Sequence, residues 1–375
     1  FWQFIASQHD KLLLQTAQHL GLTFLSLLLA MAVGIPLGIF ISRRRPLANP
    51  VLGVAGVLQT VPSIALLGFM IPAFGIGATP AIIALLIYAL LPIIRNTYTG
   101  ITGVNPMITE AATALGMNKS QRLFKVELPL AMPVIIAGVR TAAVINVGVA
   151  TLGSFVAAGG LGEFIFGGIS LNNTNMILAG ALPAALLAIL IDLGIGYLQR
   201  SGRKAMRYAL YLVVVTGIAT TLFILWPSGT EKLRAGFTPE FMGRQDGDMG
   251  LRSVYGLRLN PKVLSDAVMY KAAHEGSLDV ISGYSTDGRV KEHDFLVLED
   301  DKKIFPPYYA APIVKSTTLT RLPGLENALN LLSGKINDSV MASLNHKADI
   351  LNQSPQRIAT DFLKAAGLYK PSRDG

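Results

Sequence analysis

Five histidines are the side chains of this chain best suited to acid–base or metal chemistry. They stand at positions 9, 19, 274, 293 and 346, and their spacing matches no metal-binding motif. The chain has no cysteine, so neither disulfides nor thiolate metal sites need to be considered. No nucleophile motif of the Gly-x-Ser-x-Gly type and no Gly-x4-Gly-Lys-Ser/Thr phosphate loop occurs. We therefore expect no catalysis by this chain and no cofactor bound to it.

The most regular polar pattern lies between two long uncharged runs. Glu110, Ala111 and Ala112 are followed after three residues by Gly116 and, after nine more, by the stretch 126–129, which reads Val-Glu-Leu-Pro. Its length and its place between apolar segments indicate a loop that contacts a partner. An ordinary amphipathic surface hairpin is the alternative.

Local signals predict the shape of residues 105–129, which we name the elbow. Asn105 can cap a helix and Pro106 suits its first turn, while Gly116 can take the left-handed conformation that ends it. A second short helix is expected over 119–126, and Pro129 is expected to stop it. A bulky residue at position 116 is expected to straighten or break the turn. One side of the elbow carries a small apolar face that can dock in a partner's groove: Met107, Ala111, Ala114 and Leu115.

Composition predicts a membrane protein joined to a second domain, because the chain is 51% hydrophobic and 15% charged. Nearly uncharged runs long enough to cross a bilayer cover 20–41, 51–74, 78–94, 131–158, 177–198 and 208–226. We expect an amphipathic segment at the outer interface over 1–19 and a polytopic α-helical membrane domain with five core helices over 20–207. A sixth helix over 208–229 would tether an extracytoplasmic domain, 230–375. A soluble domain with six buried core helices is the alternative.

The placement of charge predicts the orientation of these spans. Up to Gly229 there are 13 Lys and Arg against 5 Asp and Glu, whereas from Thr230 the counts are 19 and 18, so +8 of the net +9 belongs to the first part. The basic residues gather in every second loop, at 43–45, 95–125 and 200–207. Because positive loops mark the cytoplasm, the elbow is expected inside, with the N-terminus and the second domain outside. Their position beside apolar spans argues against nucleic acid as a partner.

Ionisable residues inside the spans are expected to face protein or water, because a charge near the bilayer centre costs about 2.5–3.5 kcal/mol. Arg140 and Asp192 would lie near a pathway or form a pair, or Arg140 would snorkel towards the cytoplasm. The Gly-Gly-Leu-Gly stretch at 159–162 is expected to form a tight external bend. Four prolines interrupt the spans, where helices can bend: Pro62, Pro80, Pro92 and Pro183.

The elbow resembles the cytoplasmic Glu-Ala-Ala loop of bacterial ABC importer permeases, whose pattern is Glu-Ala-Ala-x3-Gly-x9-Ile-x-Leu-Pro. Only Val126 departs from that pattern. The resemblance implies a type I ABC importer permease in the bacterial cytoplasmic membrane, acting as a homodimer on a dimer of cytoplasmic ABC ATPases that bind ATP and Mg²⁺. It also implies which elbow residues couple to the ATPase: Glu110, Ala111, Ala112, Gly116, Leu128 and Pro129.

From Thr230 onward the pattern is that of a soluble α/β domain. Short strands are expected over 278–281 and 295–298, alternating with helical stretches, one of them over 325–332. Ser354 as cap, Pro355 at the first turn and Gly367 past the end frame a further helix. Its buried face is expected to carry Ile358, Phe362, Leu363 and Ala366.

Four stretches of this second part resemble substrate-binding proteins for quaternary amines such as glycine betaine, choline and carnitine. They cover 240–247, 283–289, 297–301 and 305–312. The resemblance implies an α/β fold like that of periplasmic binding proteins, in which Tyr284 and Tyr308 are walls of a cage and Arg244 holds a ligand carboxylate. Tyr309 is an alternative to Tyr308, and Thr286 contributes to the site or only shapes its turn.

Such residues suit the chemistry of the ligand. A trimethylammonium group has no N–H to donate, so a site surrounds it with aromatic faces that each contribute about 0.5–2 kcal/mol when desolvated. A guanidinium can hold a carboxylate through its planar fork of donors. The alternatives are amphipathic packing for each tyrosine and a surface ion pair of Arg244 with Asp246.

Binding proteins of this type have two lobes, and the matching part begins well inside the fold. The opening part of the first lobe is therefore expected to be missing between Gly229 and Thr230, by omission or truncation. We expect a fused permease and binding subunit of an ATP-driven importer for a small quaternary amine. The alternatives are the same architecture importing ergothioneine, or a ligand-gated sensor or channel.

Overall fold

A computed structural model describes residues 1–200, 233–242, 244–257, 259 and 261–369. The chain divides into two compact units: Phe1–Glu240 with Asn260–Asp279, and Phe241–Leu259 with Val280–Gly375. The sixth span expected at 208–226, most of the basic cluster before it and the junction at 229–230 lie outside the described residues.

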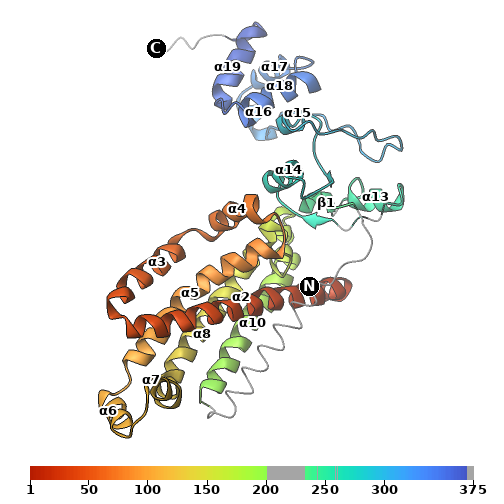
Figure 1. Ribbon diagram of the computed structural model, residues 1–375. Coiled ribbons are helices and arrows are strands. Elements are labelled where there is room, and N and C mark those ends of the chain that lie inside the picture. Colours follow the sequence, from red (N-terminus) through yellow and green to blue (C-terminus); the bar gives the residue numbers. More distant parts are fainter. Residues whose placement is uncertain (201–232, 243, 258, 260, 370–375) are drawn as a thin grey trace. The chain divides into compact units, whose positions relative to one another are not determined.

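Residues 1–200, which we call the helical domain, are built of helices (Figure 1). In chain order these are α1 (Trp2–Ser7), α2 (His9–Arg43), η1 (Arg45–Leu47), α3 (Ala48–Thr60), α4 (Ser63–Phe74), α5 (Ala78–Thr102), α6 (Pro106–Ala114), α7 (Lys119–Arg122), η2 (Leu123–Glu127), α8 (Leu128–Ala150), η3 (Thr151–Val156), α9 (Gly162–Ser170) and α10 (Thr174–Arg200). The long helices α2, α5, α8 and α10 pack against one another, while α6 and α7 lie together at one end of this domain.

Helices of membrane-spanning length cover four of the first five spans that the sequence predicts, all except 51–74. The described residues hold four helices long and apolar enough to cross a bilayer, or five if α3 and α4 form one bent span. The bend between α3 and α4 is 94° and falls at Pro62, one of the four prolines expected to interrupt spans. There the Tyr88 hydroxyl donates a hydrogen bond to the Val61 carbonyl, which has no helical partner at the break.

The first long helix begins earlier than the sequence predicts. Residues 9–19 run without a break into α2 and are not a separate segment that ends near Leu20. Their polar side chains made the stretch look interfacial, but two of them are buried against later parts of the domain. Gln15 donates to the Glu163 carboxylate, and the His19 ring nitrogen Nε2 lies 3.1 Å from the Val147 carbonyl oxygen.

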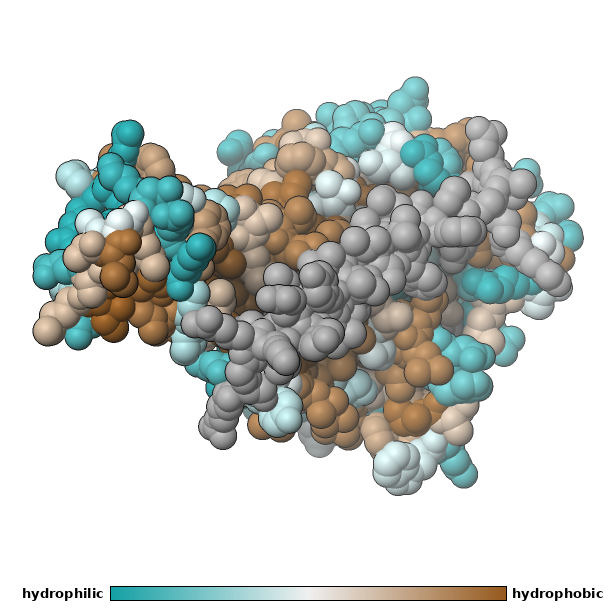
Figure 2. Space-filling view, turned by 60° about the horizontal axis from the view of Figure 1, so that its bottom comes forward, coloured by the Kyte–Doolittle hydropathy of each residue, from teal (hydrophilic) through white to brown (hydrophobic). Residues whose placement is uncertain are grey.

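Small residues allow α2 and α5 to approach closely. A Cβ added to Gly34 would lie 2.9 Å from Ile93, and one added to Gly38 would lie 2.6 Å from Thr97. Glycines four residues apart are a common means of close helix packing in membranes. Apolar side chains cover much of the outside of the domain, as the brown areas of Figure 2 show, and α10 alone exposes seven large apolar or aromatic side chains. These are Leu178, Leu182, Leu186, Ile189, Leu190, Leu193 and Tyr197.

The C-terminal part contains short strands and helices. They are β1 (Ala235–Phe237), α12 (Pro239–Met242), α13 (Asp248–Ser253), β2 (Lys262–Val263), α14 (Asp266–His274), β3 (Val280–Ile281), α15 (Gly288–Glu292), α16 (Ser316–Arg321), α17 (Leu325–Asn330), α18 (Asp338–Asp349) and α19 (Pro355–Ala365). In the first unit, β1 pairs in parallel with β2, with Gly236 opposite Lys262. A Cβ on Gly236 would lie 2.5 Å from Leu278, so the core beside this strand is tightly packed.

Two predictions for this part have opposite outcomes. The helix framed by Ser354 and Gly367 is confirmed as α19: the Ser354 hydroxyl accepts from the Arg357 N–H at 3.3 Å, and Gly367 has φ +70°. The strand predicted over 295–298 is wrong, because these residues form no regular element and Leu296 and Leu298 are exposed. Apolar residues alone do not make a strand without a neighbouring strand to pair with.

Candidate functional sites

The first helix of the elbow is capped as the sequence predicts. The Asn105 side chain accepts from the Met107 N–H at 2.9 Å, and Pro106 occupies the first turn. At the other end Gly116 has φ +81°, and its N–H donates to the Thr113 carbonyl at 2.9 Å. The next N–H, of Met117, donates to the Ala112 carbonyl at 3.1 Å. These two hydrogen bonds form the Schellman pattern of a helix C-terminus.

The Glu-Ala-Ala residues lie on different sides of α6. Glu110 and Ala111 are exposed, whereas Ala112 is buried and is the one buried residue of this helix. Leu115 and Met107 are among the most exposed apolar side chains of the helical domain, 80% and 74% exposed. The exposed side of α6 therefore combines apolar side chains with one carboxylate, as a docking surface would.

The second half of the elbow differs from the prediction at its end. Asn118 and Gln121 form a reciprocal capping box at the start of α7, with hydrogen bonds of 3.0 and 2.8 Å. The chain then passes through the π-helical turn η2 directly into α8, so Pro129 does not stop a helix. Pro129 stands in the first turn of α8, after Leu128, where a missing N–H is tolerated, and the wider turn before it accommodates the ring. Both residues are half-buried.

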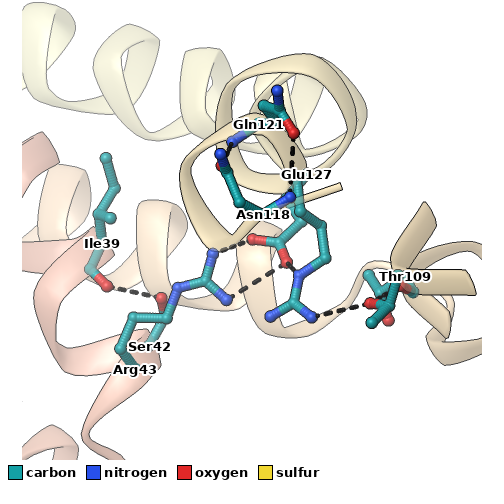
Figure 3. Close-up of polar contacts among 9 residues, drawn as sticks. Ile39, Ser42, Arg43, Thr109, Asn118, Gln121 and Glu127 are labelled. Carbon is teal, nitrogen blue, oxygen red and sulfur yellow. Dashed lines mark hydrogen bonds and ion pairs between the residues drawn. The ribbon is translucent and has the colours of Figure 1, made fainter. Parts of the chain in front are cut away.

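One carboxylate that the sequence analysis did not single out joins three parts of this region. Glu127 is buried, with 4% of its side chain exposed, and accepts hydrogen bonds from two arginines. Arg43, at the end of α2, donates to both carboxylate oxygens, one at 3.2 Å, and the Arg122 Nε donates at 2.9 Å (Figure 3). Arg122 also donates to the Thr113 hydroxyl of α6 at 3.2 Å.

The charges inside the spans pair with each other. Arg140 of α8 donates from Nε and from one terminal nitrogen to the two carboxylate oxygens of Asp192 on α10, both at 2.5 Å. Of the alternatives that the sequence left open, the pair is what the structure has. Pairing lowers the cost of holding either charge in a bilayer.

The ligand-binding residues predicted in the second unit gather around Tyr308. The rings of Tyr284 and Tyr308 lie with centroids 6.4 Å apart and planes at 85°, so they form a corner. Arg244 lies beside it, with its guanidinium carbon 5.2 Å from the Tyr308 ring centroid and a hydrogen bond of 2.8 Å to the Tyr308 hydroxyl. Two aromatic faces and a guanidinium are therefore brought together from positions far apart in sequence.

Arg244 also forms the ion pair with Asp246 that was the alternative interpretation. Its Nε donates to Asp246 at 2.8 Å, a terminal nitrogen donates to the other carboxylate oxygen, and the Tyr308 hydroxyl donates to that same oxygen. The Arg244 guanidinium, and next the Tyr308 hydroxyl, hold the pKa of the Asp246 carboxyl below its usual range. Burial and the hydrogen bond to Asp246 raise the pKa of Tyr308 to about 12.

The other two predicted residues are placed differently. Tyr309 is 87% exposed. The Thr286 carbonyl accepts from the Asn345 side chain at 2.8 Å, and Thr286 lies in a turn closed by the Asp287 N–H and the Tyr284 carbonyl at 3.0 Å. Thr286 thus holds the turn that carries Tyr284. Within the described parts of the chain, no group of three or more His, Asp or Glu side chains could hold a metal ion.

Comparison with known proteins relates both parts of the chain to transport. Residues 34–208 match the family described as binding-protein-dependent transport system inner membrane component. Residues 227–365 match the substrate binding domain of the ABC-type glycine betaine transport system. The first match contains the whole elbow, and the second contains the corner formed by Tyr284 and Tyr308.

Individual relatives agree with the first match. A carnitine transport permease protein of Listeria monocytogenes is 46% identical over 55% of this chain and 95% of its own length. A choline transport system permease protein of Bacillus subtilis is 42% identical over 53% of this chain and 91% of its own length. An osmoprotectant import permease protein of Salmonella typhimurium is 49% identical over 47% and 85%.

Among solved structures, the inward-facing MetNI methionine ABC transporter matches 52% of this chain and 97% of its own, with 25% identity and a TM-score of 0.48. A glycine betaine/carnitine/choline ABC transporter structure matches 37% of this chain and 52% of its own, with 37% identity and a TM-score of 0.33. The length and identity of the sequence matches decide the family. The chain belongs to the inner membrane components of binding-protein-dependent transport systems, and it carries on the same polypeptide a substrate-binding domain of the ABC-type glycine betaine transport family.

Proposed function

We propose that this chain is the membrane-spanning and substrate-binding subunit of an ATP-driven importer for a small quaternary amine of the glycine betaine, choline or carnitine type. The observation that carries the proposal is the corner of Tyr284 and Tyr308 beside Arg244, in a domain of the glycine betaine-binding family. A trimethylammonium group fits against such a corner because each face attracts it, by about 0.5–2 kcal/mol when desolvated. Carnitine and choline are the cargoes named for two of the related permeases.

Arg244 would bind a ligand carboxylate with only part of its guanidinium. The edge formed by Nε and one terminal nitrogen is engaged by Asp246 and Tyr308, and the other terminal nitrogen has no hydrogen-bond partner among the described residues. That nitrogen keeps two N–H donors for a carboxylate such as that of glycine betaine or carnitine. Choline has no carboxylate and would depend on the aromatic faces and on Asp246.

The elbow would pass force from the motor to the spans. The exposed face of α6, with Glu110 and Leu115, would dock on a separate ATPase subunit, which binds ATP and Mg²⁺. Five core spans enclose no pathway alone, so we infer a homodimer on an ATPase dimer. The elbow would lie in the cytoplasm, and the N-terminus and the binding domain outside the cell membrane.

Binding measurements test the cargo and the cage together. Calorimetry with the purified full-length chain should give binding of one or more of glycine betaine, choline and carnitine. Tyr284→Ala, Tyr308→Ala and Arg244→Ala should each weaken that binding about tenfold or more. Tyr309→Ala is the matched control for Tyr308→Ala and should have little effect. If Tyr309→Ala lowers the affinity more than Tyr308→Ala does, Tyr309 is the second wall of the cage. Normal ligand binding in all four variants would refute the site.

Transport assays test the mechanism. Uptake into proteoliposomes should require the ATPase subunit and ATP. Uptake without the ATPase would indicate a channel. Ligand binding without any uptake would indicate a sensor. Ergothioneine belongs in the ligand panel because it also carries a trimethylammonium and a carboxylate. If only ergothioneine binds tightly, the importer architecture stands but the assigned cargo is wrong.

A further inference from the structure

The contacts of Glu127 give this residue a function beyond the docking surface of α6. We propose that Glu127 is a positioning residue that locks the elbow to the cytoplasmic end of α2, so that movement of α6 is passed to the first long helix (Figure 3). The inference rests on the proposed importer function for the source of the movement. The lock itself can be measured without any substrate.

Without these hydrogen bonds, few contacts fix the orientation of α6 relative to the spans. Ala112 is its one buried residue, and the Gly116 turn that follows is exposed, with no atom within 4 Å of a Cβ added there. On the other side of α7 the chain passes through a π-helical turn, whose wider geometry is less regular than an α-helix. A helix that is held by one small side chain, and that joins α8 only through these two turns, would swing when pushed.

The polar network supplies the missing constraint. Thr113 of α6 accepts from Arg122, Arg122 donates to Glu127, and Glu127 accepts from Arg43 of α2. Each link is a directional hydrogen bond from a charged guanidinium, and two of the links join it to a carboxylate of opposite charge, which strengthens them. The chain of contacts runs from the docking helix to the end of a membrane span without a gap.

The arrangement also explains why the residue must be a glutamate. One carboxylate oxygen accepts from both arginines, at 3.2 and 2.9 Å, while the other accepts from Arg43. A glutamine of the same shape has one acceptor oxygen and no charge to balance the two guanidinium groups. The substitution Glu127→Gln therefore keeps the volume of the side chain, removes its charge and replaces one acceptor of Arg43 by an N–H donor, which weakens the lock. Removing one partner of a buried pair leaves the other charges uncompensated.

Spin-label distances test the lock directly, and the cysteine-free sequence makes labelling specific. Labels at Leu115→Cys and Arg45→Cys, both exposed positions, report the separation of the elbow and the end of α2. The permease in nanodiscs should give a narrow distance distribution, and Glu127→Gln should broaden it about twofold or more. Lys125→Gln is the matched control, because Lys125 is an exposed charge of the same turn, and it should leave the width unchanged.

A second variant covers the case in which Glu127→Gln fails to fold. Arg122→Gln keeps the pair of Glu127 with Arg43 and removes the hydrogen bonds of Arg122 to Glu127 and to Thr113, so it should broaden the distribution as well. It makes the same change of charge as Lys125→Gln. Equal widths in the wild type and both network variants, or equal broadening with Lys125→Gln, would overturn the proposal.

Coupling gives the functional readout. With the ATPase subunit in proteoliposomes, Glu127→Gln should lower the amount of amine imported per ATP hydrolysed about tenfold, with unchanged ligand binding. An unchanged ratio would also count against the lock. If the wild type imports no quaternary amine, the proposed function fails, but the label distances still decide whether Glu127 fixes the elbow.

Discussion

The Tyr308 side chain contributes to the candidate cage with both its ring and its hydroxyl. The hydroxyl accepts from Arg244 and donates to Asp246, while the ring forms the corner with Tyr284. Because the polar contacts hold the ring in place, this wall is ordered before a ligand arrives, which reduces the entropy cost of binding. The same contacts place a carboxylate beside the site where a cation is expected.

Asp246 should therefore influence which quaternary amine is preferred. In Asp246→Asn the guanidinium of Arg244 loses its counter-charge, so it attracts a ligand carboxylate more strongly, while choline loses a nearby negative charge. We expect the affinity for choline relative to glycine betaine to fall about fivefold, since exposed ion pairs are worth up to about 1 kcal/mol. Calorimetry with both ligands measures the ratio.

The control for this prediction is Asp361→Asn, which removes the same charge from an exposed ion pair with Arg357 in α19. It should leave the ratio unchanged. A ratio that rises in Asp246→Asn, or that falls equally in the control, would show that Asp246 does not act on the ligand.

Gly116 is required for its backbone conformation and not for space. A Cβ there would meet no atom within 4 Å, but φ is +81°, a region that costs other residues about 1–2 kcal/mol. Gly116→Ala should lower ATP-coupled uptake and spare ligand binding, with Gly116→Asn milder because Asn visits this region more easily. Gly56→Ala, also in open space but within α3, is the control. Equal uptake in wild type and Gly116→Ala would mean that the turn tolerates strain.

The residue-scale predictions that succeeded depend on neighbours in sequence. Asn105 and Gly116 act on N–H and carbonyl groups within a few residues, so their roles follow from residue type and position. Glu127 was missed because Arg43, its partner, is 84 residues away. A carboxylate just before an apolar span needs a partner, and the basic end of the first span was on the same predicted side, which was the available signal.

At the scale of elements, proline was interpreted correctly in one place and wrongly in another. Pro62 ends α3 and starts α4, and the freed Val61 carbonyl finds the Tyr88 hydroxyl. Pro129 was expected to end a helix, but it stands in the first turn of α8. Whether a proline breaks or begins a helix depends on the turn before it, and a π-helical turn leaves no signature that residue propensities reveal.

The strand β1 is held at its start by an ion pair that acid should break. Arg234 donates to Asp279 from its side chain at 2.6 and 3.0 Å and from its backbone at 2.8 Å. The side-chain hydrogen bond, followed by the backbone one, lowers the pKa of Asp279 to about 2. A lowered pKa means that the stabilisation is complete above the ordinary value of 3.8 and is lost as the pH falls through about 2.

Thermal unfolding in detergent should show this dependence. The midpoint of the transition that includes β1 should fall between pH 5 and pH 2.5 more in the wild type than in Asp279→Asn, which has lost the pair at every pH. At pH 5 the variant should be the less stable of the two. If both proteins lose the same stability on acidification, Asp279 is not a source of the acid sensitivity.

For the molecule as a whole, the fusion of binding domain and permease has a direct consequence for transport. A binding domain tethered to its own permease is present near the entrance at an effective concentration of about millimolar, provided that the link can reach. Two tethered domains would be available in a homodimer. This advantage exists only if the binding domain lies on the side of the membrane from which the cargo comes. That side is set by the number of spans that precede the domain.

The topology can be tested with single cysteines in a chain that has none of its own. Trp2, Leu115 and Ile313 are all highly exposed, and they report the N-terminus, the elbow and the binding domain. Three spans separate Trp2 from Leu115, if the bent pair α3 and α4 counts as one, so they lie on opposite sides. Ile313 lies on the side of Trp2 only if the segment 208–226 also crosses.

An impermeant maleimide applied to intact cells should therefore label Trp2→Cys and Ile313→Cys, and should reach Leu115→Cys only after permeabilisation. Labelling of Leu115→Cys from outside would place the elbow away from ATP and refute the importer, whereas protection of Ile313→Cys alone would show that the sixth segment does not cross and that the binding domain faces the cytoplasm.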